Sequence, residues 1–193
     1  MKIRFPLSRI LGSIAEGAAT EMGLAIAVAI ADHEGLLQYF ARMAGTLPAS
    51  TEIAISKAYT AAALRMSTRE VGQLALPGSP LYGIQHTNVG KIVLFGGGFP
   101  LRLRGEVAGG IGISGGSVEE DERVAQAVLD TLAEMESLAE AITPLVCGKP
   151  EGKNWMSQLE RSLEKYFFGE GCFIPHAFIS LLTGALIMAY DDV

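Results

Sequence analysis

One long amphipathic pattern limits most strongly what this chain can fold into. Ser117 and Glu120 have the spacing of a capping box, and acidic residues occupy positions 119–122, where they suit the positive end of a helix dipole. Apolar residues then recur at helical intervals from Val124 to Ile142, which is the pattern of one helix face. The sequence therefore predicts a long helix that begins after Ser117 and packs one face on a core.

Two stretches ahead of that helix have the pattern of β-hairpins. Residues 24–31 are apolar on both faces, which predicts a central strand, and the turn at 32–35 leads to a partner strand that ends at Arg42. A second hairpin is predicted around the compact turn at 104–105. The glycines between 109 and 112, inside its second strand, indicate close approach of a helix, a bulge or another backbone.

The remaining pattern adds helices and one more strand. Helices are predicted over 7–22, from Pro48 onward, and after a second capping box at 67–70. A short strand is predicted over 91–98, where an apolar run ends in three glycines. Together these elements predict an α+β domain in which an antiparallel sheet of about five strands is flanked by helices.

The length of 193 residues suits one domain with an extension. After Pro144 the pattern changes, because a linker-like segment, a helix candidate and a final apolar run follow. We therefore expect a domain over 1–144 and a helical C-terminal extension with two helices over 145–193.

Composition excludes several classes of partner and site. The net charge is −6 and no basic residues cluster, whereas binding of nucleic acid starts from clustered lysine and arginine. The longest apolar runs, 24–31 and 177–190, are shorter than the roughly 20 residues that span a bilayer. The N-terminus lacks the apolar core of a signal peptide, and Cys147 and Cys172 have neither disulfide-framework nor zinc-site spacing.

The same composition indicates where the protein works. Two thiols without a pairing pattern are typical of a reducing cytoplasm, so we expect a cytoplasmic protein without nucleic acid or a membrane span. Hydrophobic residues make up 49% of the chain and the mean hydropathy is +0.32. Such an apolar chain is expected to bury part of its surface against other subunits.

Four segments form an ordered set of motifs. Segments 27–42, 50–63, 96–116 and 117–129 read AVAIADHEGLLQYFAR, STEIAISKAYTAAA, GGGFPLRLRGEVAGGIGISGG and SVEEDERVAQAVL. In this order they resemble the GlcG/HbpS-like family of haem-degrading or haem-binding domains, which includes the C-terminal domain of PduO-type corrinoid adenosyltransferases. The similarity runs from about Leu7 to Glu140, and residues beyond 144 depart from the family pattern.

The resemblance implies a fold and a role. It implies a profilin-like antiparallel sheet flanked by helices, assembly into dimers or larger homo-oligomers, and a cytoplasmic accessory function. It also implies binding of haem or a corrinoid. Some members of the family occur beside diol or glycerol dehydratase systems and bacterial microcompartments.

Neither glycine cluster has the pattern of a nucleotide site. No GK[ST] follows the glycines at 96–98, and the GxGxxG spacing is missing. They are interpreted either as a tight turn between strands or as a flat wall, free of side chains, for a planar ligand. The glycines at 115–116 precede a helix start that suits an anion, but the acids at 119–122 favour a cap there instead.

Two histidines and one lysine are the remaining candidates. His86 is the first candidate for an axial ligand, because haem iron needs such a donor and its loop leads into the glycines at 96–98. His33 lies in the turn at 32–35, and either histidine is also consistent with a solvated surface residue. Lys57 interrupts an apolar helix stripe. It either has a lowered pKa or an anionic partner such as a propionate, or it lays its stem along the core.

We therefore expect a non-catalytic or weakly catalytic accessory protein that binds a haem- or cobalamin-like tetrapyrrole, in a dehydratase system or a microcompartment. The expected cofactor-binding residues are His86, Lys57, Gly96, Gly97, Gly98 and His33, with His86 as the metal ligand. The alternative is a structural module whose residues 145–193 recruit a protein partner without a cofactor. A third hypothesis is a small-molecule enzyme that uses Lys57.

Overall fold

The computed structural model describes residue 3 and residues 5–147, with side chains up to residue 137. The chain divides into one compact unit over Met1–Ala133, which holds the sheet, and a second over Glu134–Val193. The two helices expected within 145–193 fall beyond Cys147 and so lie outside the described residues. The expected domain boundary at 144 stays a prediction.

A four-stranded antiparallel sheet organises the first unit. Its spatial order is β2-β1-β4-β3. The strands are β1 (Ala27–Asp32), β2 (Leu37–Arg42), β3 (Gly98–Leu103) and β4 (Glu106–Ser114). Every residue of β1 is buried, which confirms that the run with apolar residues on both faces is a central strand.

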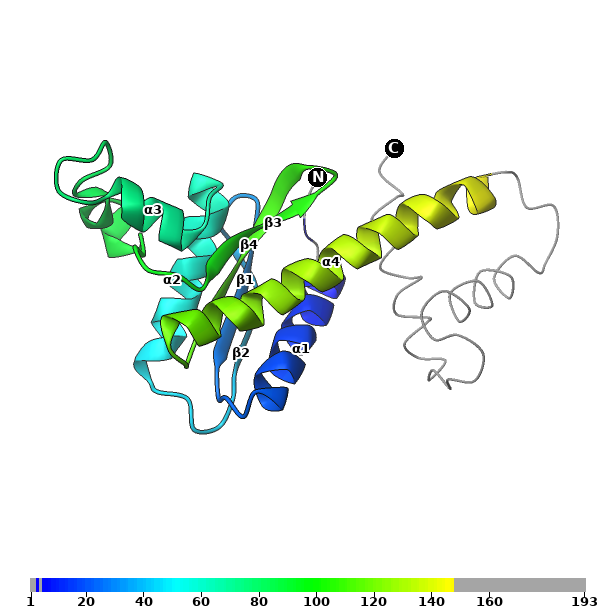
Figure 1. Cartoon of the computed structure of the whole chain (residues 1–193), viewed down its shortest axis with the longest axis horizontal. Coiled ribbons are helices and arrows are strands. Elements are labelled where there is room, and N and C mark those ends of the chain that lie inside the picture. Colours follow the sequence, from blue (N-terminus) through cyan, green and yellow to red (C-terminus); the bar gives the residue numbers. More distant parts are fainter. Residues whose placement is uncertain (1–2, 4, 148–193) are drawn as a thin grey trace. The chain divides into compact units, whose positions relative to one another are not determined.

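Helices cover both faces of this sheet. They are α1 (Phe5–Glu21), α2 (Ala49–Leu64), α3 (Thr68–Leu74) and α4 (Val118–Cys147). Figure 1 shows α2 and α3 on one side of the sheet, with α1 and the beginning of α4 on the other. Leucine, isoleucine and valine fill the layer under α1 and α4, whereas alanines fill the layer under α2. The α+β class and the antiparallel sheet are therefore confirmed.

Both predicted capping boxes are present. At the start of α3, the Ser67 hydroxyl accepts from the Glu70 N–H and the Glu70 carboxylate accepts from the Ser67 N–H. At the start of α4, the Ser117 N–H donates to Glu120 Oε2 at 2.8 Å and the Glu120 N–H donates to Ser117 Oγ at 3.3 Å. The local sequence pattern therefore marks both helix starts correctly.

The strand predicted over 91–98 does not form, which leaves four strands instead of about five among the described residues. The backbone of this segment is held by a helix side chain. The Thr60 hydroxyl of α2 accepts from the Val93 N–H at 3.0 Å, and its one proton is shared between the Ser56 carbonyl at 2.7 Å and the Lys91 carbonyl at 3.1 Å. Because these groups already have partners, the segment runs along α2 and joins the sheet only at Gly98.

The predicted close approach at the glycines of β4 is a contact with α2. A Cβ atom added at Gly112 would lie 2.1 Å from the Ala54 carbonyl oxygen, and one added at Gly110 would lie 2.4 Å from the Ala58 carbonyl oxygen. The helix backbone thus rests directly on the sheet backbone. This contact, which we call the α2–β4 seam, holds α2 at a fixed height above the strands that it covers.

On the opposite face of the sheet, a tyrosine ring packs closely against the backbone of α1. Tyr39 of β2 donates to Glu16 Oε1 of α1 at 2.5 Å, and its ring lies on the helix backbone at Gly12. A Cβ atom at Gly12 would be 2.1 Å from Tyr39 Cε1, whereas one at Gly17, on the same helix, would have no atom within 4 Å. Only the first of these two glycines is required by packing.

Replacement of these two glycines by alanine is expected to have opposite effects. Gly12→Ala should lower the free energy of unfolding by about 1–3 kcal/mol, because the new methyl group overpacks the ring. Gly17→Ala should raise it by about 0.5–1 kcal/mol, since glycine is unfavourable inside a helix. Urea unfolding followed by circular dichroism measures both, and equal effects at the two positions would contradict the packing.

Tyr39 also makes stability depend on alkaline pH. Burial, with a smaller effect of the hydrogen bond to Glu16, raises the pKa of Tyr39 from 10.0 to about 12. The fold thus favours the neutral phenol, so this contribution is complete below pH 10 and is lost as pH rises toward 12. Wild type should lose more unfolding free energy between pH 9 and pH 12 than Tyr39→Phe does. Tyr82→Phe, at an exposed tyrosine, is the control and should behave as wild type does.

Candidate functional site

A buried lysine joins three elements of the fold. Lys57 of α2 has a side chain that is 0% exposed. Its Nζ donates to the Ile113 carbonyl of β4 at 2.7 Å and to Asp121 Oδ2 of α4 at 2.8 Å. A charged lysine is almost never fully buried without a partner, and here the end of β4 and the start of α4 supply the partners.

Asp121 completes this centre from the other side. Its second oxygen, Oδ1, accepts from the Gly116 N–H at 3.0 Å. The carboxylate therefore occupies the backbone donors ahead of α4, where the sequence allowed either an anion site or a helix cap. The chain's own carboxylates at Asp121 and Glu120 take these donors, so the cap interpretation is confirmed.

Burial acts on both partners of the ion pair. It lowers the pKa of Lys57, while the hydrogen bond and charge of Asp121 act in the opposite direction. It raises the pKa of Asp121, against the opposing effect of Lys57. Each charge is costly without water, so each depends on the other to remain in the interior.

An aromatic ring and a glycine enclose the lysine head. The Phe95 ring centroid lies 5.0 Å from Lys57 Nζ, and 45% of Phe95 is exposed, so the ring contacts a cation and is also partly open to solvent. Gly97 has φ +103°, and a Cβ atom there would be 2.6 Å from Lys57 Nζ. The backbone can pass this close to the ammonium group only because residue 97 lacks a side chain.

The three glycines at 96–98 are all buried. A Cβ atom at Gly96 would meet the Glu122 carboxylate, and one at Gly98 would meet the Thr68 side chain. The Gly98 N–H also donates to Thr68 Oγ1 at 3.0 Å. The structure thus brings Lys57 and the glycine cluster together. Other residues of this chain already fill the space that a side chain at 96, 97 or 98 would occupy.

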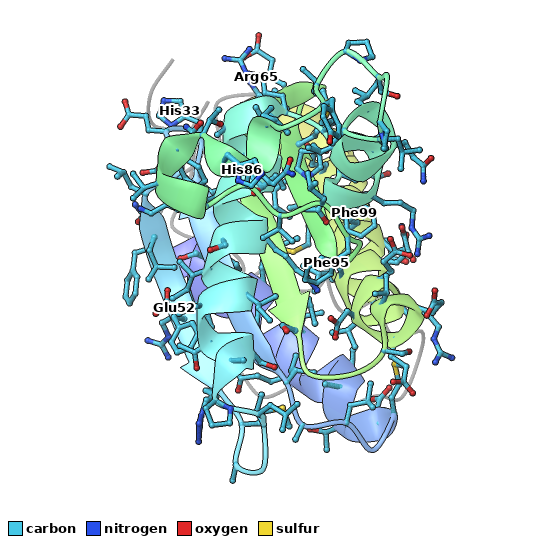
Figure 2. All side chains as sticks on the ribbon, turned by 90° about the vertical axis from the view of Figure 1, so that its left-hand side faces the viewer. His33, Glu52, Arg65, His86, Phe95 and Phe99 are labelled. Carbon is cyan, nitrogen blue, oxygen red and sulfur yellow. The ribbon has the colours of Figure 1, made fainter. Side chains whose placement is uncertain are left out.

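His86 lies outside this centre, on an exposed loop. It ends the short 3₁₀ helix η1 (Ile84–His86), ahead of a second 3₁₀ helix, η2 (Asn88–Gly90), in which all three residues have positive φ. Figure 2 shows His86 in front of α2, on the face that also carries Phe95. Beside His86, the Gln85 Oε1 atom is buried without a hydrogen-bond partner among the described residues.

The segment from 82 to 95 also exposes apolar side chains. Tyr82, Val89 and Phe95 are among the exposed large hydrophobic residues, and Val89 is 98% exposed. Val89 combines that exposure with φ +58°, a backbone conformation that is a genuine outlier for a β-branched residue. We call residues 82–95 the exposed loop segment.

His33 lies in the turn between β1 and β2, where its side chain is 29% exposed. Its Nε2 is 3.8 Å from Glu34 Oε1, and its Nδ1 is buried without a partner in the described part of the chain. No hydrogen bond or ion pair between described residues joins either histidine to Lys57 or to the glycine cluster. The candidate residues therefore form a buried centre and two separate histidine sites.

Asp121 is the residue of the buried lysine centre that sequence reasoning missed. Within the acidic run at 119–122 it looks like one more solvated helix-start carboxylate. A signal was nevertheless present, because Asp121, Val124 and Val128 follow the spacing of one helix face. All three are buried, so extending the apolar stripe one turn backwards would have identified the buried acid.

Two further findings limit the chemistry of the described residues. No group of three or more histidine, cysteine, aspartate or glutamate residues is placed to hold a metal ion in the part that was searched. None of the helices in that part is long and apolar enough to cross a membrane.

Loss of the lysine is expected to destabilise the fold. Lys57→Met should lower the free energy of unfolding by about 3–5 kcal/mol, because it leaves Asp121 buried without a partner. The double variant Lys57→Met with Asp121→Leu should recover much of that loss, since neither charge then remains. Arg123→Met, at an exposed arginine of α4, is the control, with an expected change within about 0.5 kcal/mol.

Thermal and urea unfolding of these variants distinguish two roles of Lys57. A lysine that only performs chemistry would give a Lys57→Met variant with an unchanged melting temperature. That result would contradict the structural role assigned to the ion pair.

Comparison with known proteins adds relatives of known sequence and structure. The chain is 41% identical over 120 residues to a 15.0 kDa protein of the dhaT-dhaS intergenic region of Citrobacter freundii, covering 62% of this chain and 84% of that one. It is 40% identical over 111 residues to the corrinoid adenosyltransferase PduO of Salmonella typhimurium, covering 58% of this chain and 33% of that one. The match therefore spans about a third of PduO.

A solved structure shares the fold. The crystal structure of the PduOC–haem complex aligns with a TM-score of 0.64 and 37% identity, covering 67% of this chain and 94% of that one. The family model described as haem degrading protein HbpS-like matches residues 7–130, which include the whole sheet and the buried lysine centre. The chain therefore belongs to the HbpS-like family of haem-degrading proteins.

Proposed function

We propose that this chain is a cytoplasmic accessory protein that binds a haem-like tetrapyrrole for a cofactor-dependent enzyme system. The observation that carries the proposal is its similarity to PduOC, whose structure is a complex with haem, over 94% of that chain at 37% identity. The similarity to a corrinoid adenosyltransferase supports a corrinoid as the second ligand of the same class. A dehydratase or microcompartment setting and a homo-oligomeric state belong to the same proposal.

The exposed loop segment has the chemistry that such a ligand needs. A tetrapyrrole site combines apolar surface for the macrocycle with few polar groups, and haem iron takes an axial donor. The segment offers the exposed imidazole of His86 and the exposed side chains of Tyr82, Val89 and Phe95. The unpartnered Gln85 Oε1 adds an acceptor beside the histidine, so the residues present fit the group.

Contacts with α2 hold this segment in place. The Asn88 side-chain amide donates to the Tyr59 hydroxyl at 2.8 Å, and Lys91 Nζ lies 5.6 Å from the centroid of the Tyr59 ring. The run of positive φ values at 88–90 costs free energy that these contacts have to offset. Such strain concentrates at ligand sites, and the exposed ammonium of Lys91 supplies a cation for a propionate.

The buried lysine then acts through Phe95 instead of touching the ligand. Lys57 Nζ has the Ile113 carbonyl and Asp121 as partners and the Phe95 ring above it. In this proposal the ion pair and the glycines at 96–98 support the ring from below and fix its place in the apolar surface. His33, with its unpartnered Nδ1, is the second candidate for the axial donor.

Titration with haemin tests the proposal and its donor together. Wild type should show saturable binding and a shifted Soret band. His86→Ala should weaken binding at least about tenfold, which corresponds to about 1.4 kcal/mol, and should change the band position because an axial donor is lost. His33→Ala, at the other candidate, should bind as wild type does.

The outcomes separate the parts of this proposal. Absence of saturable binding to both haemin and cobalamin would overturn the function. A loss confined to His33→Ala would transfer the donor role to the turn between β1 and β2. The alternative function, recruitment of a protein partner through residues 145–193, falls outside the described residues except for 145–147 and stays a prediction.

A further inference from the structure

Two tight backbone positions in this chain hold an arginine where glycine or asparagine is usual. Arg65 ends α2 with φ +58°, and Arg104 begins the two-residue turn between β3 and β4 with φ +50°. Helix caps of this left-handed kind favour glycine, and the first position of such a hairpin turn favours asparagine or glycine. A larger side chain at positive φ has a steric cost, so both arginines are locally unfavourable.

A third arginine joins these two positions. Arg102 of β3 donates from Nη1 to the Gly105 carbonyl at 3.2 Å and from Nη2 to the Arg65 carbonyl at 3.4 Å. One guanidinium group therefore holds the end of α2 beside the hairpin turn, although residues 65 and 102 are 37 positions apart. Arginines that do not cluster in the sequence thus meet at one end of α2 in the structure.

Arg65, Arg102 and Arg104 form what we call the arginine surface, and all three residues are exposed. Figure 2 shows Arg65 at the end of α2 opposite Glu52. The Arg65 side chain makes no hydrogen bond or ion pair to another described residue. A guanidinium group has five N–H donors, and Arg102 directs two of them at carbonyls. The surface therefore offers donors that the described part of the chain does not use.

Two acidic residues lie close to the arginine surface. The Glu70 carboxylate accepts from the Ser67 N–H and hydroxyl. These hydrogen bonds, with a smaller effect of the Arg102 charge, lower the pKa of Glu70. Glu106, which follows the hairpin turn, also has a partner already. Positive charge is therefore in excess at this place, in a chain whose net charge is −6.

The backbone cost at Arg65 and Arg104 argues against a purely structural role. Glycine or asparagine would satisfy the same two positions with less strain. Positions that break such a local rule concentrate at functional sites, where the strain is offset elsewhere. Guanidinium groups form bidentate hydrogen bonds with carboxylates, and arginine is enriched in protein interfaces. Exposed arginines on a helix end, a strand and a turn suit an extended ligand that carries several carboxylates.

We propose that the arginine surface binds an acidic peptide segment of a partner protein. Aspartate or glutamate side chains of that segment pair with the guanidinium groups of Arg65 and Arg104. Arg102 holds the two turns side by side and adds its remaining donors. This contact does not depend on binding of a tetrapyrrole at the exposed loop segment.

Titration of the full ¹⁵N-labelled chain with acetylated hexaglutamate, followed by NMR, tests the proposal. The Nε–H signals of Arg65, Arg102 and Arg104 should shift saturably, and the shifts should weaken in high salt because exposed charges are screened. Hexaglutamine is the matched probe and should cause no saturable shift. Equal effects of the two peptides would overturn the proposal, as would saturation by inorganic phosphate without any binding of hexaglutamate.

Variants at the two strained positions give the second test. Arg65→Gly and Arg104→Asn should each weaken hexaglutamate binding about two- to fivefold, the range expected for one exposed ion pair. The midpoint of urea unfolding should nevertheless rise in both variants, because the new residues adopt positive φ at lower cost. Arg123→Gln, at an exposed arginine of α4, is the control and should bind hexaglutamate as wild type does.

The combination of weaker binding and higher stability separates a binding role from a structural one. Since the variants are expected to be more stable than wild type, partial unfolding cannot explain their loss of binding. A lower unfolding midpoint in Arg65→Gly and Arg104→Asn would show that these arginines support the fold, and would overturn the proposal. Unchanged hexaglutamate affinity in both variants would overturn it as well.

Discussion

The ion pair between Lys57 and Asp121 is the interaction on which the arrangement of this domain depends. It lies where α2, the end of β4 and the beginning of α4 meet, so it joins the layers on the two faces of the sheet. Both partners are nearly free of solvent. A buried pair adds little stability compared with apolar residues, but it admits few alternative arrangements of the groups around it. We interpret it here as the contact that specifies the position of α4 relative to α2.

Several neighbouring features follow from that centre. The lysine head requires a backbone without a side chain at residue 97, which explains one member of the first glycine cluster. The carboxylate of Asp121 requires free N–H groups ahead of α4, which the second cluster supplies at Gly116. The two glycine clusters are therefore parts of one structure on opposite sides of the same ion pair, and neither is a phosphate-binding loop.

Much of the fold was predictable because its signals are local. The capping boxes at Ser67 and Ser117 and the strand predicted over 24–31 depend on residues a few positions apart. The structure has both boxes, and it has the strand over Ala27–Asp32. The segment 91–98 was predicted wrongly because a single hydroxyl, that of Thr60, binds its backbone from a distant helix. The partner of Lys57 was missed for the same reason, since it lies 64 positions away.

The α2–β4 seam has a consequence for motion. At Gly110 and Gly112 the backbone of β4 contacts the backbone of α2. If α2 moved along β4, its carbonyl groups would meet strand residues that carry side chains, and these would clash. A packed seam of this kind has one arrangement instead of several, so α2 is unsuited to act as a hinge or a shear element. For the tetrapyrrole site that we propose, α2 is therefore a stationary platform beneath the loop between α3 and β3.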